Sequence, residues 1–328
     1  MIDLPLLNTL KTKKNLLAFS AGVDSSALFF LLTEQHIPFD IALVNYGTRE
    51  SSEVEEEHAK KLAQKYGLKC HTTRAPHFES HFEEKARTFR YDFFEDLIQK
   101  EGYETLLTAH QLNDQLEWLL MRLSKGAGLS ELLGLESVCT KEHYLLIRPL
   151  LEVSKEELLE YLESNNYPYF IDESNQEVKY ERNYFRKNFS DPLIAEYKEG
   201  IKRSFRYLKF DQKRLVSQFE LLHRQKQLHI IRLYAMEAKI QAADTVLKNM
   251  GYLMSASQRE ELERSKSLVI GGKWAIEEQN GLLYIAPYRS ADMPKDFKER
   301  CRVSKIPVKI RPYCFAEGIE PSLFATIF

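Results

Sequence analysis

The chain has 328 residues, 44% of them hydrophobic, and a formal net charge of −2 at pH 7. This length suits two or three domains with real cores, since one domain holds about 100–200 residues. No apolar run approaches the roughly 20 residues of a transmembrane helix, so no membrane partner is expected. The four cysteines form no CxxC pair, which disfavours disulfide and zinc frameworks and favours a reducing cytoplasm.

Apolar strands alternate with longer helices in the first part of the chain. We expect strands at 15–19, 41–45, 69–73 and 105–109, and helices at 25–34, 52–66, 81–100 and 113–124. This alternation predicts an α/β fold of right-handed βαβ units, with a parallel sheet that has helices on both faces. Ligands of such a sheet bind beyond the carboxyl ends of its strands, where the loops that follow the strands should meet.

The first strand leads into a loop of small residues and then into a helix. Backbone N–H groups and the positive end of the helix dipole converge there, which suits the loop to bind phosphate without a lysine. Its acid, Asp24, suits a magnesium ion beside bound phosphates. The loop lacks the Gly-Lys-Ser/Thr ending of Walker A. We predict that phosphate binds at Ser20, Ala21, Gly22, Val23, Asp24 and Ser25.

A second polar cluster stands at the start of the fourth helix. His110 follows a strand, and Asp114 and Glu117 are three residues apart, so both acids can share one helix face. Acids in a first helical turn are also stabilised by the helix dipole, which is a purely structural explanation. Gly126 and Gly128 can likewise form only a helix end and a turn.

The composition changes after Val153. Ser154 and Glu157 form a capping box that predicts a helix to about Asn165. Further on we expect a long charged helix at 192–228, helices near 230–250 and 257–265, a hairpin of 274–277 with 282–285, and short strands within 296–328. Asn280-Gly281 is a strong signal for the turn of that hairpin.

Positive charge is concentrated in the second half. Residues 179–226 hold 13 Lys/Arg against 6 Asp/Glu, and residues 294–312 hold 7 against 2. This asymmetry predicts a basic face for nucleic acid, and a solvated helix surface is the alternative. We therefore divide the chain into a catalytic domain at 1–190, a basic linker helix at 191–228 and a smaller mixed α+β domain at 229–328.

Several motifs resemble those of known families. The sequence SAGVDS at 20–25 resembles the SGGxDS signature of the PP-loop ATP pyrophosphatases, which cleave ATP to AMP and pyrophosphate. The segment at 110–134 resembles HxxDDQxE…GxGLxGLxG of the tRNA(Ile)-lysidine synthase family. Colinear likenesses to that family are VNYGTR at 44–49, the E-x-x-AR-x-x-RY helix at 84–91, RPLL at 148–151 and DxSN…RNxxR at 172–186. Together they cover about residues 15–190.

The resemblance implies a PP-loop domain of the adenine-nucleotide alpha-hydrolase type, and an ATP-dependent ligase. Such an enzyme joins L-lysine to C2 of the wobble cytidine of a CAU-anticodon isoleucine tRNA, through an adenylated base, and releases AMP and pyrophosphate. ATP would lie on the loop at 20–25 with Mg²⁺ on Asp24. Asp114 and Glu117 would hold the amine of lysine and accept its proton. His110 would orient an acid, contact phosphate or serve only the structure.

The same resemblance implies what five arginines contact and which partners the protein has. Contacts to tRNA or to the leaving groups are implied for Arg87, Arg90, Arg148, Arg182 and Arg186, with ion pairing to nearby acids as the alternative. The small domain would recognise tRNA. The implied location is cytoplasmic, and a homodimer is left open because members of the family are often dimers.

Three residues depart from the family pattern. Ala21 replaces a glycine and is strained if its φ is positive. Tyr46 replaces a histidine, and Asn113 replaces the first acid of an Asp-Asp pair, which keeps a carbonyl but loses a charge. These departures leave two alternatives, another PP-loop tRNA-modifying enzyme and a non-catalytic tRNA-binding relative.

Overall fold

The computed structural model describes residues 4–47, 51–78, 80, 82–171, 181–216 and 218–326. The chain divides into two compact units, Met1–Arg206 and Tyr207–Phe328. Across those described ranges, no helix has both the length and the apolar character needed to cross a membrane.

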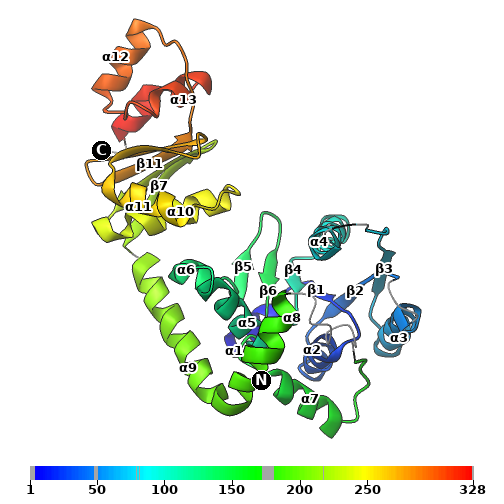
Figure 1. The fold of residues 1–328 in the computed structure, drawn as a ribbon. Coiled ribbons are helices and arrows are strands. Elements are labelled where there is room, and N and C mark those ends of the chain that lie inside the picture. The colour runs from blue at the N-terminus through cyan, green and yellow to red at the C-terminus, as the bar shows by residue number, and fades with distance from the viewer. Residues whose placement is uncertain are drawn as a thin grey trace. The chain divides into compact units, whose positions relative to one another are not determined.

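The first unit is built on a six-stranded sheet with the order β3-β2-β1-β4-β6-β5 (Figure 1). Its strands are β1 (Asn15–Ala18), β2 (Phe39–Asn45), β3 (Cys70–Arg74), β4 (Thr105–Leu107), β5 (Val138–Thr140) and β6 (Leu145–Ile147). Neighbouring strands pair in parallel from β3 through to β6, which confirms the predicted parallel sheet. Only β5 is antiparallel, in an edge hairpin with β6 that was not predicted from the sequence.

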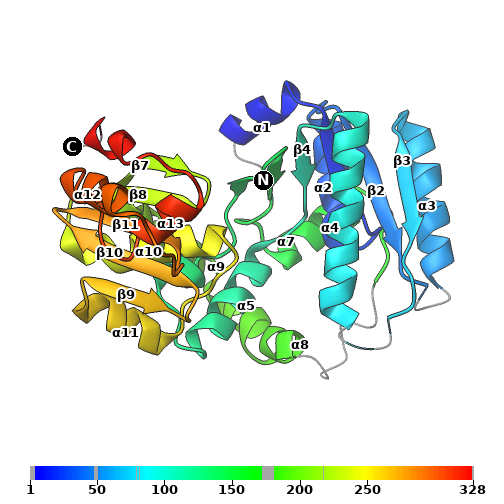
Figure 2. The ribbon, with the colours of Figure 1, turned by 90° about the horizontal axis from the view of Figure 1, so that it is seen from above.

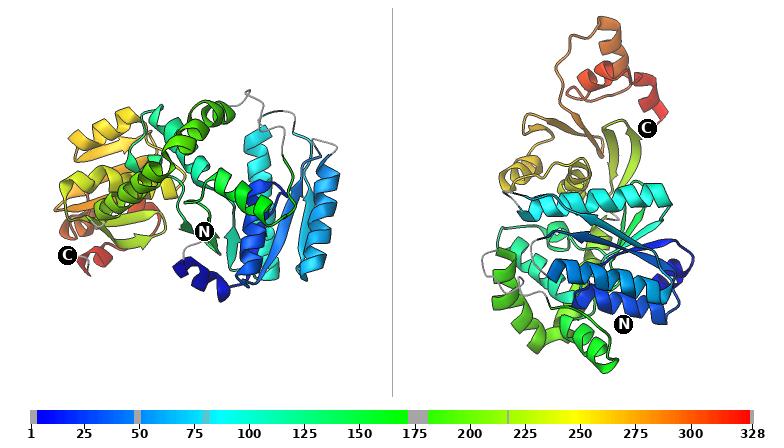
Figure 3. Two further views of the ribbon diagram at one scale, coloured as in Figure 1. Left: turned by 90° about the horizontal axis from the view of Figure 1, so that it is seen from below. Right: turned by 90° about the vertical axis from the view of Figure 1, so that its right-hand side faces the viewer.

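Helices cover both faces of this sheet, with α2 and α3 on one face and α4 on the other (Figure 3). The helices of the unit are α1 (Leu4–Lys11), α2 (Val23–Glu34), α3 (Ser51–Tyr66), α4 (Phe82–Glu101), α5 (Leu112–Leu123), α6 (Leu129–Leu132), α7 (Lys155–Ser164), α8 (Glu181–Phe185) and α9 (Asp191–Val216), with a π-helical turn η2 (Arg186–Ser190) between the last two. Helix α7 begins with the predicted capping box of Ser154 and Glu157.

Alternation along β1 explains the two layers of core. Leu17 packs in one cluster with Phe29 of α2, and Leu16 packs in another with Phe94 of α4. Successive side chains of a strand point to opposite faces, so a strand with both faces buried needs a continuous apolar run. The polar residues that follow such a strand are thereby left at the edge of the sheet.

The second unit holds a five-stranded antiparallel sheet with the order β7-β8-β11-β10-β9 (Figure 2). Its strands are β7 (Phe219–Gln225), β8 (Leu228–Leu233), β9 (Ser267–Ile270), β10 (Trp274–Gln279) and β11 (Leu282–Pro287). Two separate buried clusters pack on its two faces, one with α10 (Lys239–Asn249) and α11 (Ala256–Arg264), the other with α12 (Lys295–Val303) and α13 (Arg311–Ala316). Short 3₁₀ turns are η3 (Met236–Ala238) and η4 (Pro321–Thr326).

The predicted hairpin of the second unit is confirmed as β10 and β11. Its turn residues Asn280 and Gly281 have φ of +53° and +74°. Both central residues of a type I′ turn need positive φ, and asparagine and glycine tolerate it best.

Three predictions for the second half are wrong. The helix expected to reach residue 228 ends at Val216, and 219–225 is strand β7. The helix expected from 230 begins only at Lys239, because the short apolar run before it is strand β8, which pairs with β7 and β11. The strands expected within 296–328 are helices instead. Phe297 and Cys301 of α12 are both buried at a spacing of four residues, which is helical.

Candidate active site

The small-residue loop joins β1 to α2 and leads directly into the N-terminus of that helix. Gly22 is the N-cap of α2 and supplies no side-chain cap, so the first N–H groups of the helix face the loop. Within the loop, the Ser25 hydroxyl accepts from the Ser20 N–H at 3.2 Å. An anion bound at this helix N-terminus would accept hydrogen bonds from its N–H groups.

Ala21 has a φ of +59°, in the left-handed region. For an L-residue with a Cβ this conformation costs roughly 1–2 kcal/mol. Its carbonyl accepts from the Phe170 N–H at 2.9 Å and from the Ser26 hydroxyl at 3.2 Å. These bonds hold the strained conformation that a glycine would adopt more easily.

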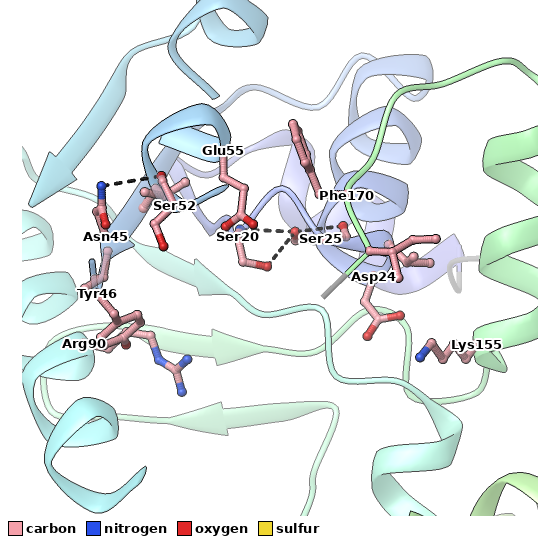
Figure 4. A pocket seen from close by; sticks show the side chains of 15 residues that line it. Ser20, Asp24, Ser25, Asn45, Tyr46, Ser52, Glu55, Arg90, Lys155 and Phe170 are labelled. Carbon is pink, nitrogen blue, oxygen red and sulfur yellow. Dashed lines mark hydrogen bonds between the residues drawn. The ribbon is translucent and has the colours of Figure 1, made fainter. Parts of the chain in front are cut away.

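A pocket of about 360 Å³ opens on this loop, beyond the carboxyl ends of β1 and β2 (Figure 4). Its polar lining includes Ser20, Asp24, Ser25, Asn45, Tyr46, Ser52, Glu55, Arg90 and Lys155. The loops that follow β1 and β2 meet here, as predicted, whereas the loops that follow β3 and β4 contribute no residue to the lining of this pocket. Glu55, Lys155 and Phe170, which also line the pocket, were not among the predicted site residues.

Asp24 has a buried oxygen, Oδ1, that lacks a hydrogen-bond partner within the described ranges. Burial and then the charge of Asp114 raise the pKa of Asp24 to about 7, although Lys155, Arg186 and Arg182 oppose the rise. A carboxylate with an unsatisfied buried oxygen fits a hard cation such as Mg²⁺. The described residues contain no group of three or more His, Cys, Asp or Glu that could hold a metal, so substrate oxygens would have to supply the other ligands.

Lys155 is the first residue of α7, and its side chain points toward Asp24 (Figure 4). Within the described part of the chain its ammonium forms no ion pair or hydrogen bond. A lysine at a helix N-terminus lies against the helix dipole. A lysine at this unfavourable position of a predicted helix is therefore the sequence signal by which Lys155 could have been recognised as a site residue.

The acids of α5 meet two of the predicted arginines. Arg182 donates to Asp114 at 2.8 Å and to Glu117. Arg186 donates to Glu117 at 2.9 Å and to Asp114 at 3.3 Å. In this structure the ion-paired alternative therefore applies to these two arginines. The DxSN motif that precedes them lies outside the described residues.

The two carboxyl groups of this cluster differ in their ionisation. Burial raises the pKa of Glu117, and the two arginines offset only part of that rise. Burial also opposes ionisation of Asp114, but positive charge around it outweighs burial and lowers its pKa. Burial lowers the pKa of His110 to about 4, so His110 is neutral at pH 7 and the guanidinium groups keep Asp114 ionised. Environments that separate two carboxyl pKa values are typical of acid–base chemistry.

The other three predicted arginines lie apart from these acids. Arg90 lines the phosphate-loop pocket. Arg87 lies over the ring of Tyr91, with 4.9 Å between its Cζ and the ring centroid. Arg148 follows β6 and is buried, with 7% of its surface exposed. Arg87 and Arg148 both line one further pocket, so the five arginines lie in three different surroundings.

Asn113 uses its side chain to join helices. Its amide donates to Asp191 at the start of α9 at 2.7 Å, and its carbonyl accepts from the Lys155 N–H at 3.2 Å. A carboxylate in its place would lie against the carboxylate of Asp191. This geometry explains why a neutral residue is suited to the position in this chain.

The fold and the loop define a member of the PP-loop proteins, and the PP-loop domain family model matches residues 4–193. The chain is 45% identical to the tRNA(Ile)-lysidine synthase of Campylobacter jejuni subsp. jejuni over 97% of both chains. It is 45% identical to that of Wolinella succinogenes over 98% of this chain and 99% of the relative, and 43% identical to that of Helicobacter pylori over 96% and 93%. The chain belongs to the tRNA(Ile)-lysidine synthase family.

Proposed function

We propose that the chain ligates L-lysine to C2 of the wobble cytidine of a CAU-anticodon isoleucine tRNA, at the expense of ATP. The observation that carries the proposal is the closeness of the phosphate loop to the acid cluster. Asp114, Lys155, Arg182 and Arg186 all act electrostatically on Asp24, which supports our assignment of the loop and the paired acids to one site.

The first half-reaction activates the base. The phosphates of ATP lie on the N–H groups at the start of α2, and Lys155 contacts them as a cation. The C2 oxygen of the cytidine attacks the α-phosphorus, and pyrophosphate leaves. Asp24 would hold Mg²⁺, which neutralises phosphate charge when bound. A target base flipped into a pocket fits the way enzymes act on bases.

The second half-reaction transfers lysine. The ε-amine attacks C2 of the adenylated base, a proton leaves the amine, and AMP leaves with the C2 oxygen. Glu117 is our proton acceptor, because a carboxylate with a raised pKa is the better base. Asp114 stays ionised and orients the cationic amine. Neutral His110, whose Nδ1 is 2.9 Å from the Thr108 hydroxyl, can accept or donate one hydrogen bond without adding charge.

The test is AMP release from ATP with L-lysine and an isoleucine tRNA transcript that carries a CAU anticodon. We expect AMP only with that tRNA, lysine-dependent turnover, and loss of both in Asp24→Ala. Binding of the tRNA without AMP release would refute the proposal and favour a non-catalytic tRNA-binding protein. We further propose a cytoplasmic location, because tRNA is modified there, and dimerisation stays a prediction.

A further inference from the structure

A second pocket of about 370 Å³ lies between α4 and the β5–β6 hairpin. It shares no lining residue with the phosphate-loop pocket. The side chains that matter here are Arg87, Tyr91, Glu95, Lys141, Tyr144 and Arg148. The edge hairpin, absent from the sequence predictions, is what creates this pocket.

Arg148 lines this pocket and has hydrogen-bonding capacity that the described residues do not use. One of its guanidinium nitrogens, Nη1, donates to the Glu136 carbonyl at 2.8 Å, whereas Nε is buried and has no hydrogen-bond partner among the residues that the structure describes. Within the described ranges no carboxylate forms an ion pair with it. A buried charge without a counter-charge is costly unless a ligand supplies one. A guanidinium in this state favours an anion with several oxygens, such as a phosphate.

The walls add positive charge and an aromatic surface. The guanidinium of Arg87 lies over the ring of Tyr91, and Lys141 lies on the turn of the hairpin. Two acids, Asp92 and Glu95, also line the pocket, and Glu95 accepts from the Tyr144 hydroxyl at 3.1 Å. A guanidinium stacked on a tyrosine is a platform on which a nucleobase can lie.

The pocket adjoins the acid cluster. Arg148 and Arg87 both act on His110 and contribute to its lowered pKa. The pocket shares no lining residue with the phosphate-loop pocket, so it can take a part of the substrate other than the phosphates of ATP. RNA offers both a phosphate for a guanidinium and a base for an aromatic surface.

We propose that this pocket binds one nucleotide of the RNA substrate that flanks the modified base, with its phosphate on Arg148 and its base against Arg87 and Tyr91. The inference rests on the proposed function, because it takes RNA as the substrate. It assigns Arg148 to the RNA backbone rather than to the leaving pyrophosphate, since the pocket is separate from the phosphate loop.

The test is binding of a hairpin RNA that carries the CAU anticodon loop, without ATP or lysine, at several salt concentrations. We expect Arg148→Met to weaken binding about 10- to 100-fold, as for loss of a hydrogen bond to a charged group. The negative slope of log affinity against log salt should become shallower by about 0.7 for each phosphate that the variant no longer neutralises. Affinities for ATP and for inorganic pyrophosphate should stay unchanged.

Two further variants guard against misfolding. Lys141→Gln, on an exposed turn, should weaken RNA binding in the same direction, and Lys100→Ala at the far end of α4 should not. Hairpins with a single neutral methylphosphonate locate the contact. At one position beside the wobble nucleotide, the substitution should weaken binding to the unaltered protein and have no effect on Arg148→Met.

The outcomes distinguish failure of the proposed function from failure of the flanking-nucleotide pocket. If the unaltered protein does not bind the hairpin, the proposed function fails. If it binds but Arg148→Met binds equally well, or loses pyrophosphate affinity instead, the flanking-nucleotide pocket is refuted while the proposed function stands.

Discussion

Replacing Asp24 by asparagine should stabilise the ligand-free protein and abolish its activity. The pKa of Asp24 is about 7 in the folded chain, against 3.8 for the ordinary carboxyl group. A raised carboxyl pKa means that the folded state holds the proton more tightly than the unfolded state. The carboxyl group therefore lowers the stability as the pH rises from about 4 to 7.

The size of the effect follows from the shift. One pKa unit corresponds to about 1.4 kcal/mol, so the charge on Asp24 destabilises the fold by about 4 kcal/mol above pH 7 and by almost nothing at pH 4. Asparagine has nearly the same shape as the protonated acid and carries no charge. Asp24→Asn should thus gain up to about 4 kcal/mol at pH 8 and little at pH 4.

Urea denaturation of the first unit measures this, with Trp118 fluorescence as the signal and Trp274→Phe in every protein. Asp96→Asn is the matched control, because Asp96 is exposed on α4, and it should change little at either pH. A gain that is equal at pH 4 and pH 8, or no gain at all, would show that the buried charge of Asp24 is not the cause. AMP release should be lost at both pH values, since the asparagine cannot replace a carboxylate beside the phosphates.

Four further changes test other parts of the site. Asn113→Asp should destabilise the first unit by about 3 kcal/mol, because it replaces a hydrogen bond to the Asp191 carboxylate by a like-charge pair. Urea denaturation should show that Asp191→Asn in the same chain restores most of the lost stability. A double variant whose stability is not restored would contradict the pairing. Ala21→Gly should change stability by less than about 1 kcal/mol, since relief of the left-handed alanine is offset by the lost methyl and by a more flexible unfolded chain; a urea midpoint far below that of the unaltered protein would argue against the strain. Lys155→Met should raise the KM for ATP about 10- to 100-fold, with Lys155→Arg close to the unaltered enzyme, and an unchanged KM would remove Lys155 from the ATP site. Glu117→Gln should keep tRNA-dependent exchange of pyrophosphate into ATP and lose lysine transfer by about 100-fold or more, whereas loss of both steps would mean that Glu117 does not act only as the base for the amine.

Local patterns in the sequence were sufficient to predict much of the secondary structure of the first unit. Leu16 and Leu17 lie in an unbroken apolar run, Ser154 and Glu157 close a helix start within one turn, and the loop before α2 shows its chemistry in consecutive residues. The same patterns failed in the second unit, where charged residues between Phe297 and Cys301 obscured a helical spacing. Local rules succeed where the energy that decides a conformation comes from neighbours in the chain.

Only the tertiary structure decided which charges meet. Arg182 and Glu117 are 65 residues apart in the sequence and form one ion pair. Lys155 faces Asp24 because α7 begins beside α2, and Arg148 lines a pocket between the hairpin and α4 without an ion pair to any described residue. The sequence by itself determined the first four strands, the phosphate loop and the family motifs, since those depend on spacing along the chain. The pairing, burial and ionisation of the site residues depend on long-range packing, so they became visible only in the folded chain.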